Sequence, residues 1–342
     1  MPNATAADGM TTLVTGGTGR LGSAVLEALL DSGHRNIRCF VRPGITRAHL
    51  HHLQKKHGSG SVEIVYGNLT QRGDVARAVH GVDRVIHLAA SLRGAPADMF
   101  LNTVVGSKIL FDAVNRSRVR RIVVVSTLSV YELHDTSPAQ TIDESAVVER
   151  RPEWRDVYTH TKVLQEQLLH RAPLRERLSW VVLRPGPLYG NTTPVLPARL
   201  GLQLAGCLLQ LGASAALPLT HLANCADAIR LATFDDEIDS GAYNVVDDDL
   251  PTVSEFIARY RAEVHRIPTL RLPLAATLLL ARLNEHSHKR WGAQVPPILT
   301  TYRVRNLWRG HQYANVRLKA AGWRQPIATR DALDTAFKSW RT

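Results

Sequence analysis

The sequence predicts an α/β fold whose core is a doubly wound parallel sheet, with a smaller second lobe towards the C-terminus. Two features predict this class: short strands rich in Val and Ile alternate with helix-compatible segments, and a glycine-rich turn joins the first strand to the first helix. Strands of this apolar type lie in sheets that helices cover on both faces. The expected strands are residues 11–15, 37–41, 62–66, 84–88, 121–125, 180–183 and 242–246.

The composition is that of a globular protein with one large unit or two domains. The 342 residues are 44% hydrophobic and 21% charged, which excludes wholesale disorder and fibrous structure. The three cysteines, Cys39, Cys207 and Cys225, lie far apart and outside any Cys/His cluster. We therefore expect neither a disulfide framework nor a metal site, and a reducing, cytoplasmic location.

Lys and Arg exceed Asp and Glu by 42 to 30, which gives a formal net charge of +12. The basic residues gather in groups, without the interleaved aromatic side chains of a nucleic-acid interface. We interpret these groups as solvated faces and expect no nucleic-acid partner. One such group contains Arg116, Arg118, Arg120 and Arg121.

Two apolar stretches raise the question of a membrane span. Residues 200–219 carry no charge over 20 positions, but glutamines, glycines and Pro218 dilute their hydropathy. Residues 272–280 are too few to cross a bilayer, and the first ten residues lack the basic and apolar parts of a secretory signal. We predict buried or lid-like segments, and leave a weak association with a membrane surface open.

Gly16, Gly19 and Gly22 lie in the segment TGGTGRLG, between the first strand and a helical segment at 23–30. In a strand–turn–helix of this spacing, one glycine permits the tight turn, one lets the backbone approach a pyrophosphate, and one lets the helix pack on the strand. The N-terminus of the helix adds unpaired N–H groups and a partial positive charge. The turn therefore predicts a dinucleotide-binding site.

The end of the second strand favours NADP over NAD. A carboxylate there would bind the ribose 2′-hydroxyl of NAD, whereas an arginine accommodates the 2′-phosphate of NADP. The segment FVRPG holds Arg42 and no carboxylate, and Arg20 in the glycine turn is a second candidate for the phosphate. NAD stays open as the alternative.

Tyr158 and Lys162 stand four residues apart, which places them on one face of a helix. A nearby ammonium stabilises a phenolate and lowers the pKa of the tyrosine, which suits acid–base chemistry on an alcohol. The segment STLS at 126–129 follows the strand at 121–125, where a hydroxyl would hydrogen-bond the substrate oxygen. Together these residues predict an oxidoreductase active site.

Ordered motifs along residues 11–326 make the chain similar to the extended short-chain dehydrogenases/reductases. It resembles their NAD-dependent epimerase/dehydratase family, with some likeness to the 3β-hydroxysteroid dehydrogenases. The resemblance implies a Rossmann-type dinucleotide-binding domain at 11–190 and a mainly substrate-binding lobe at 191–342, from which about 220–250 return to the first domain. The matching segments are TGGTGRLG (15–22), YGNLT (66–70), HLAA (87–90), STLSVY (126–131), YTHTK (158–162), RPGPLYG (184–190), HLANCADAI (221–229), YNVVDDDLP (243–251) and AAGWRQP (320–326).

Carried over position by position, the resemblance implies roles for the site residues. Tyr158 would be the catalytic acid/base, Lys162 would hold the nicotinamide ribose and lower the tyrosine pKa, and Thr127 would polarise the substrate oxygen. Asn102 would be the family's Asn before a helix, although Val105 stands where a glycine is common. The other implied cofactor-binding positions are Gly16, Gly19, Arg20 and Leu21 at the pyrophosphate, Asn68 (in place of the usual Asp) and Leu69 at the adenine, Leu88, Ala89 and Ala90 under the cofactor, and Pro185 and Leu188 beside the nicotinamide.

By the same resemblance the enzyme would interconvert a secondary alcohol and a ketone by hydride transfer, as an epimerase or as a net reductase. Leu128 and Ser129 stand where the family's dehydratases carry an Asp-Glu pair, which disfavours dehydration. A non-catalytic NADP-binding sensor is disfavoured because the Thr, Tyr and Lys are all retained. The resemblance also implies a homodimer.

Two classes of small-molecule substrate remain, and the resemblance favours a nucleotide sugar. Its diphosphate would need cations from the second lobe. The alternative is an apolar, steroid-like or lipid ketone or alcohol, for which the uncharged segments 200–219 and 272–280 would line a pocket or dock at a membrane surface. The candidate cations for a diphosphate are Arg199, Arg303, Arg305 and Arg309.

Overall fold

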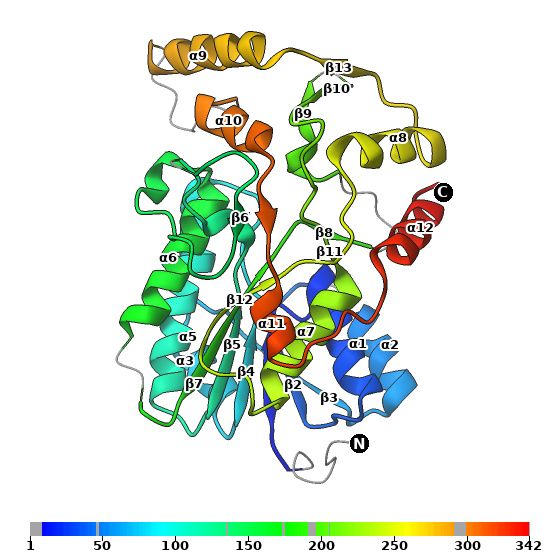
Figure 1. The fold of residues 1–342 in the computed structure, drawn as a ribbon. Helices are drawn as coiled ribbons and strands as arrows, with labels where there is room; N and C mark the ends of the chain where they lie inside the picture. The colour runs from blue at the N-terminus through cyan, green and yellow to red at the C-terminus, as the bar shows by residue number, and fades with distance from the viewer. Residues whose placement is uncertain are drawn as a thin grey trace.

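The computed structural model describes residues 9–45, 48–134, 136–172, 175–190, 196–204, 206–290 and 299–341. A seven-stranded parallel sheet forms its centre, with the strand order β12-β7-β5-β4-β1-β2-β3 (Figure 1). Helices cover both faces, so the predicted α/β class with a doubly wound Rossmann-type sheet is confirmed. The strands are β1 (Thr12–Thr15), β2 (Ile37–Val41), β3 (Val62–Tyr66), β4 (Arg84–His87), β5 (Arg121–Val125), β7 (Ser179–Pro185) and β12 (Gly241–Val245).

All seven predicted strands exist, and their ends differ from the prediction by two residues at most. Their apolar runs follow from burial on both faces: every residue of β5 is buried, and so is every residue of β1. In the register of the sheet, Val14 lies between Cys39 on β2 and Ile86 on β4. The carboxyl ends of β1, β4 and β5 therefore meet at one edge, where the polar residues of the site follow.

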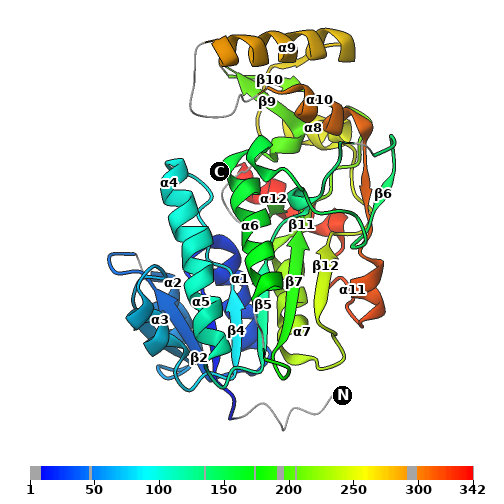
Figure 2. The ribbon, with the colours of Figure 1, turned by 90° about the vertical axis from the view of Figure 1, so that its left-hand side faces the viewer.

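Two layers of helices enclose the sheet, one on each face (Figures 1 and 2). Their apolar side chains form two separate cores with the inward residues of the strands. The first layer contains α1 (Arg20–Asp31), α2 (Ala48–His57), α7 (Leu222–Phe234) and α11 (Val316–Ala320). The second contains α3 (Arg72–Val79), α5 (Gly106–Asn115) and α6 (Val157–Arg171).

The group of arginines before β5 is only partly a solvated face. Arg116, Arg118 and Arg120 are exposed, as expected, but Arg121 is buried. Its guanidinium donates hydrogen bonds to the carbonyl oxygens of Asp235 and Ile238, just beyond the end of α7. The expectation is wrong for this residue because these carbonyls, which no longer belong to a helix, need a buried donor.

A π-helical turn, η1 (Phe100–Val105), joins α4 (Pro96–Met99) to α5 without a break. Asn102 therefore lies inside a continuous helical stretch, not before a helix as predicted. A π-turn accommodates one residue more than the α-helical ladder. This places Gly106, instead of residue 105, against Leu69, where an added Cβ would come within 3.1 Å of the Leu69 Cβ.

The smaller lobe lies beyond the carboxyl ends of the sheet strands (Figure 1). The lobe contains β9 (Gly201–Leu204), which pairs antiparallel with β10 (Cys207–Gln210), and β13 (Thr269–Arg271) pairs with β10. The uncharged run at 200–219 is thus a largely buried pair of strands and a loop in its described residues. The helices of the lobe are α8 (Val253–Glu263), α9 (Leu274–Arg290), α10 (Thr301–Arg309) and α12 (Thr329–Trp340), with a short turn η4 (Ala198–Leu200).

Short elements link the lobe to the sheet. The pair β8 (Leu188–Tyr189) and β11 (Thr220–His221) leads into α7, and β12 then joins the sheet beside β7. The pair β6 (Thr141–Ile142) and β14 (Gln312–Tyr313) brings the C-terminal part of the chain back to β12. The predicted division at residue 190 stays a prediction, because it falls beside residues 191–195, which lie outside the described ranges. The remaining short turns are η2 (Leu128–Val130) and η3 (Pro152–Trp154).

The apolar stretch at 272–280 forms the two-residue connection after β13 and the first part of α9. In the described part of the chain, no helix has the length and apolar character that crossing a membrane requires. The described residues also contain no group of three His, Cys, Asp or Glu side chains placed to hold a metal ion.

Candidate active site

The glycine turn between β1 and α1 is shaped by contacts that leave no room for a side chain. Gly16 has a φ of +75°, and a Cβ there would lie 2.8 Å from the backbone nitrogen of Ala89. A Cβ on Gly22 would overlap the carbonyl oxygen of Gly16. The N-cap of α1 is Gly19, no side chain caps the helix, and its first turn holds no acidic residue. The N–H groups of this helix end are thus available to a phosphate, which is the fit that a bound dinucleotide requires.

One cavity of about 1120 Å³ runs from this turn to the smaller lobe. Every residue predicted for catalysis or cofactor binding lines it, so the structure brings that set together; the role of each stays a prediction. In the cofactor half, the residues come from the carboxyl ends of β1, β2, β3, β4, β5 and β7, from β8, and from α1, η1 and α6. These lining residues are Gly16, Gly19, Arg20, Leu21, Arg42, Asn68, Leu69, Leu88, Ala89, Ala90, Asn102, Thr127, Tyr158, Lys162, Pro185 and Leu188.

Of the two arginines predicted at a 2′-phosphate, Arg42 is exposed at the cavity. Arg20 is also an exposed residue of the cavity lining, but its Nη2 donates a hydrogen bond to the carbonyl oxygen of Gly190 at 3.0 Å. Burial lowers the pKa of Arg20, and the contact with Gly190 ties α1 to the end of β8. Arg42 is therefore the better placed of the two for a phosphate on the ribose.

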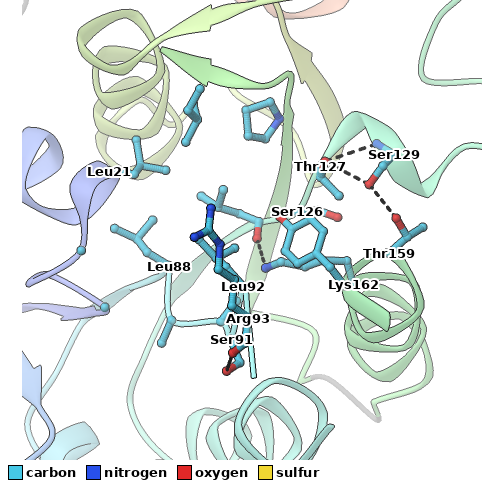
Figure 3. Close-up of a pocket in the computed structure, with 18 of the residues that line it drawn as sticks. Leu21, Leu88, Ser91, Leu92, Arg93, Ser126, Thr127, Ser129, Thr159 and Lys162 are labelled. Atoms are coloured by element: carbon cyan, nitrogen blue, oxygen red, sulfur yellow. Dashed lines mark hydrogen bonds between the residues drawn. The ribbon is translucent and has the colours of Figure 1, made fainter. Parts of the chain in front are cut away.

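The helix α6 positions the catalytic pair. Its N-cap is Asp156, whose Oδ1 accepts a hydrogen bond from the backbone nitrogen of Thr159 at 3.0 Å. Tyr158 and Lys162 follow on one face and line the cavity together. Figure 3 shows Lys162 in the cavity. The Lys162 Nζ is buried and donates to the carbonyl oxygen of Val125 at 2.8 Å and to Gln165 Oε1 at 2.9 Å. An ammonium has three protons, so one remains for a hydroxyl in the cavity.

Burial dominates the titration of both groups. It raises the pKa of Tyr158 to about 12, an effect that the Asp156 carboxylate strengthens and a hydrogen bond with Thr127 opposes. Burial also lowers the pKa of Lys162 to about 8. The predicted lowering of the tyrosine pKa is therefore wrong for the protein without its cofactor, because loss of water around the phenol raises this pKa. At neutral pH the phenol keeps its proton.

A chain of hydroxyls orients Thr127 (Figure 3). Thr159 Oγ1 lies 2.7 Å from Asp156 Oδ2 and 3.2 Å from Ser129 Oγ. An ionised carboxylate only accepts, so Thr159 gives its proton to Asp156. Ser129 directs both its N–H (3.3 Å) and its hydroxyl (3.2 Å) at Thr127 Oγ1. Thr127 Oγ1 thus accepts from Ser129, and its own proton is left for the phenol of Tyr158 or for a ligand oxygen in the cavity.

A second series of hydrogen bonds, between fully buried side chains, supports Lys162 and was not predicted from the sequence. Gln165 Nε2 donates to Ser107 Oγ at 2.7 Å, Ser107 donates to the carbonyl oxygen of Thr103, and His87 Nε2 lies 2.9 Å from Ser107 Oγ. Because Ser107 has spent its only proton, His87 Nε2 is the donor, and His87 Nδ1 accepts from Thr15 Oγ1 at 2.7 Å. Burial lowers the pKa of His87 to about 3, so the ring is neutral, as this pattern requires.

The sequence contained only weak signals for this chain of hydrogen bonds. Gln165 stands three residues after Lys162, which places the two on the same side of α6. His87 belongs to the HLAA segment that the family resemblance already included. Neighbouring buried pairs are structural: Arg184 forms a two-bonded ion pair with Glu166 at 2.6 and 3.1 Å and joins β7 to α6.

The four arginines predicted for a diphosphate do not form one cluster. Arg199 donates to Tyr313 Oη at 2.8 Å and stacks over that ring, and Arg309 donates to the carbonyl oxygens of Leu133 and His134. Arg303 lines the cavity beside Asp156, and burial lowers its pKa. Arg305 is exposed and does not line the cavity. Of the four, only Arg199 and Arg303 therefore face it.

Comparison with known families agrees with this geometry. The model of the NAD dependent epimerase/dehydratase family matches residues 12–245, which is more than half of the chain. The chain belongs to this family. Its members include NAD(P)-dependent enzymes of the short-chain dehydrogenase/reductase type, and the chain is an enzyme of that type.

Several curated proteins of this family are similar in sequence. Over 97% of this chain and 98% of the other, it is 27% identical to sterol demethylase protein B of Methylococcus capsulatus. It is 31% identical to a 3 beta-hydroxysteroid dehydrogenase/Delta 5-->4-isomerase of Mycobacterium tuberculosis and 30% identical to a UDP-glucose 4-epimerase of Azospirillum brasilense. These last two matches cover 52% and 54% of this chain, and the chain spans about half of the length of each protein.

Solved structures share the fold over almost the whole chain. The Thermus thermophilus UDP-glucose 4-epimerase in complex with NAD superposes with a TM-score of 0.68 over 97% of this chain and 99% of that one, at 19% identity. A short-chain dehydrogenase/reductase superfamily protein from Agrobacterium tumefaciens with bound NAD gives a TM-score of 0.67 over 97% of each chain, at 20% identity. Both superpositions show that this chain shares the fold of these proteins, including the smaller lobe.

Proposed function

We propose that this family member is an NAD(P)-dependent dehydrogenase/reductase that interconverts an apolar secondary alcohol and its ketone. The observation that carries the proposal is the wall of the cavity on its substrate side, which residues of the smaller lobe form together with loops and helix ends of the sheet domain. Apolar side chains line much of this wall, and three of its four arginines contact the chain itself. Arg155 pairs with Glu149 at 2.8 Å, Arg199 contacts Tyr313, and Arg303 lies beside Asp156. The apolar wall residues are Leu92, Leu133, Trp154, Val157, Leu196, Pro197, Leu222 and Leu307.

This wall suits an apolar skeleton better than a diphosphate. A diphosphate needs cations whose hydrogen bonds are unspent, whereas an apolar ligand gains affinity from each side chain that it removes from water. The similarity to sterol demethylase protein B over nearly the full length of both chains supports the same choice. So does the 34% identity over about half of the chain to a ketoreductase whose name specifies a farnesylated quinoline oxide.

A nucleotide sugar stays the second candidate, and it was the class that the sequence favoured. One observation supports it: Arg93 lines the cavity and is exposed, so it offers a cation near the substrate half. The similarity to a UDP-glucose 4-epimerase supports it as well.

The residues of the site divide the work of the reaction. When bound, the nicotinamide supplies or accepts the hydride. Tyr158 holds a proton at neutral pH, so it donates that proton to the carbonyl oxygen during reduction and takes it back during oxidation. Thr127 donates a hydrogen bond to the same oxygen, and Lys162 offers its third proton to the ribose. The apolar wall excludes water from the reacting carbon.

Turnover with two panels of substrates tests the proposal. The purified enzyme is given NAD or NADP with 3β-hydroxysteroids, or the reduced cofactors with 3-ketosteroids and prenylated ketones, and reduced nicotinamide is followed by its absorbance. We expect stoichiometric formation or loss of reduced cofactor. Epimerisation of a UDP-sugar without net cofactor change, together with no turnover of any apolar substrate, would replace this function by the second candidate.

For the cofactor we propose NADP, because Arg42 is exposed at the cavity directly after β2 and no carboxylate follows that strand. Replacing it (Arg42→Gln) should raise the Kd for NADPH by about tenfold or more, the loss of one paired guanidinium–phosphate contact. The Kd for NADH should change little. An equal effect on both dinucleotides would show that Arg42 does not select the phosphate.

We also propose the family's homodimer. Leu101 and Val105 are exposed on the helical stretch 96–115, at 46% and 42%, on the side of the sheet that also carries α6. A dimer that buries this face should become monomeric in Leu101→Glu, as measured by light scattering after gel filtration. A monomeric wild type would contradict the proposed dimer. The predicted cytoplasmic location stays a separate prediction that this experiment does not test.

A further inference from the structure

The outer face of α9 exposes an unusual amount of apolar surface. Leu279 and Leu283 are 57% and 58% exposed, and their spacing of four places them on the same side of the helix. This helix lies at the end of the molecule farthest from the central sheet (Figures 1 and 2). The exposed leucines of α9 and of the strand before it, which we call the leucine face, are Leu270, Leu274, Leu279, Leu280 and Leu283.

The opposite side of α9 is fixed to the lobe, so the leucine face cannot simply rotate inwards. Thr277 and Ala281 are fully buried, and α10 packs against the helix. Asn284 Nδ2 donates to the carbonyl oxygen of Leu299 at 2.9 Å, and Glu285 Oε1 accepts from the backbone nitrogen of Thr301 at 2.8 Å. The helix thus presents a stable apolar face outwards.

The exposed residues with a permanent charge in the described part of the stretch 264–290 are all arginines. This stretch carries four exposed arginines, and its single carboxylate, Glu285, accepts hydrogen bonds from Thr301 at the start of α10. Exposed leucines beside exposed arginines are the pattern of a helix that lies in the interface of an anionic bilayer. The arginines are Arg266, Arg271, Arg282 and Arg290.

We propose that α9 docks this enzyme on the surface of a bilayer that contains anionic phospholipid. The leucine face enters the boundary between headgroups and acyl chains, and the arginines contact the phosphates. A second copy of the chain fits this face less well. Two leucine faces related by a twofold axis would bring the arginines of both copies together, with no exposed carboxylate of the same stretch to pair with them.

The docking helix lies one layer from the substrate cavity. The helix that packs against it, α10, contributes Tyr302, Arg303, Asn306 and Leu307 to the cavity wall. Docking would therefore place the cavity close to a store of apolar molecules, which is consistent with the proposed substrate class. The inference does not depend on that class, because binding to vesicles is measured without substrate or turnover.

Flotation of the full-length enzyme with large unilamellar vesicles tests the proposal. One set of vesicles contains phosphatidylcholine alone, and the other contains phosphatidylcholine with phosphatidylglycerol. We expect binding to the anionic vesicles that weakens as salt is raised, and little binding to the neutral ones. In the double variant Leu279→Glu/Leu283→Glu, the bound fraction should fall at least about fivefold. The variant Arg282→Gln/Arg290→Gln should lose the preference for anionic vesicles.

Val147→Glu/Val316→Glu is the matched control, since these exposed valines lie on other elements and the charge change is the same. It should bind vesicles more strongly than Leu279→Glu/Leu283→Glu. Unfolding temperature and NADPH binding confirm that each variant is folded. The proposal is overturned if the wild type does not bind vesicles, or if the valine control loses as much binding as Leu279→Glu/Leu283→Glu. It is also overturned if the wild type is an oligomer that Leu279→Glu/Leu283→Glu dissociates and neither protein binds vesicles. That result would assign the leucine face to a second copy of the chain.

Discussion

Lys162 has three ammonium protons, and the chain accepts two of them, at the Val125 carbonyl and at Gln165. Gln165 is itself held by Ser107, which His87 and the Thr103 carbonyl orient. In this buried setting each unsatisfied group would cost stability, so the side chains keep one arrangement. The direction of the third proton, towards the cavity, is thus set by Gln165, which acts as a positioning residue.

Two substitutions of Gln165 should move the titration of Lys162 in opposite directions. Gln165→Leu removes an acceptor of the charged form, so the pKa of Lys162 should fall further below about 8. Gln165→Glu places a carboxylate beside the ammonium, so the same pKa should rise. The pH profile of kcat/KM reports these shifts, and Gln167→Leu, a half-buried residue on the same helix, is the control. Parallel shifts in both variants would show a merely structural role.

The proton donor is tested by Tyr158→Phe, which removes the phenol oxygen and keeps the ring. Since general acid catalysis contributes roughly 10²- to 10⁴-fold, kcat should fall by about that factor. The Kd for the cofactor should stay within about twofold of the wild type, because the ring still fills its place. Tyr260→Phe, on α8 and outside the cavity lining, controls for loss of a phenol as such. Activity that survives in Tyr158→Phe would assign the proton to another group.

At the scale of elements, the strands were predictable because burial on both faces favours apolar runs, such as Leu13 and Val14 in β1 and residues 122–125 in β5. The glycine turn was predictable from spacing, since contacts between residues 16 and 22 are local. The π-turn at 100–105 was not: FLNTVV has the pattern of an α-helix, and the extra residue shows only in the hydrogen-bond ladder. The chain from His87 to Lys162 joins residues up to 75 positions apart, which no local pattern reports.

The joint between β1 and α1 makes a sharp test of the element that holds the cofactor. In Gly22→Ala the new methyl group would overlap the Gly16 carbonyl and lie 2.6 Å from the Gly17 Cα. We expect a loss of roughly 1–3 kcal/mol in the free energy of unfolding from overpacking. The Kd for NADPH should rise at least about tenfold, because the helix N-terminus is displaced.

Gly73→Ala is the control for that substitution. Gly73 is exposed in the first turn of α3, and a Cβ there meets nothing within 4 Å. Alanine should leave cofactor binding unchanged and keep or raise the unfolding free energy, by up to about 1 kcal/mol. If Gly22→Ala behaved like Gly73→Ala, the turn would tolerate a side chain and the proposed fit to a pyrophosphate would fail.

At the scale of the whole molecule, the buried histidine ties the two helical segments of one layer to the centre of the sheet. His87 on β4 bonds Thr15 on β1 and Ser107 on α5, and Ser107 in turn bonds Gln165 on α6. The ring is neutral in the folded state because burial and the Lys162 ammonium lower its pKa to about 3. An imidazole in the unfolded chain takes up a proton below about pH 6.5.

Acid should therefore destabilise the fold through His87. Between about pH 6.5 and 3 the unfolded state binds the proton and the folded state does not, so the free energy of unfolding falls as the pH falls. Asp247 acts in the opposite sense, since burial raises its pKa to about 6 and the folded state binds its proton first. Denaturant unfolding of the wild type and His87→Gln at pH 7.5 and 5 separates the two, because Asp247 is common to both. We expect His87→Gln to be less stable at pH 7.5, from lost hydrogen bonds, and to lose less stability on acidification. An equal acid loss in both proteins would mean that the ring is protonated when folded.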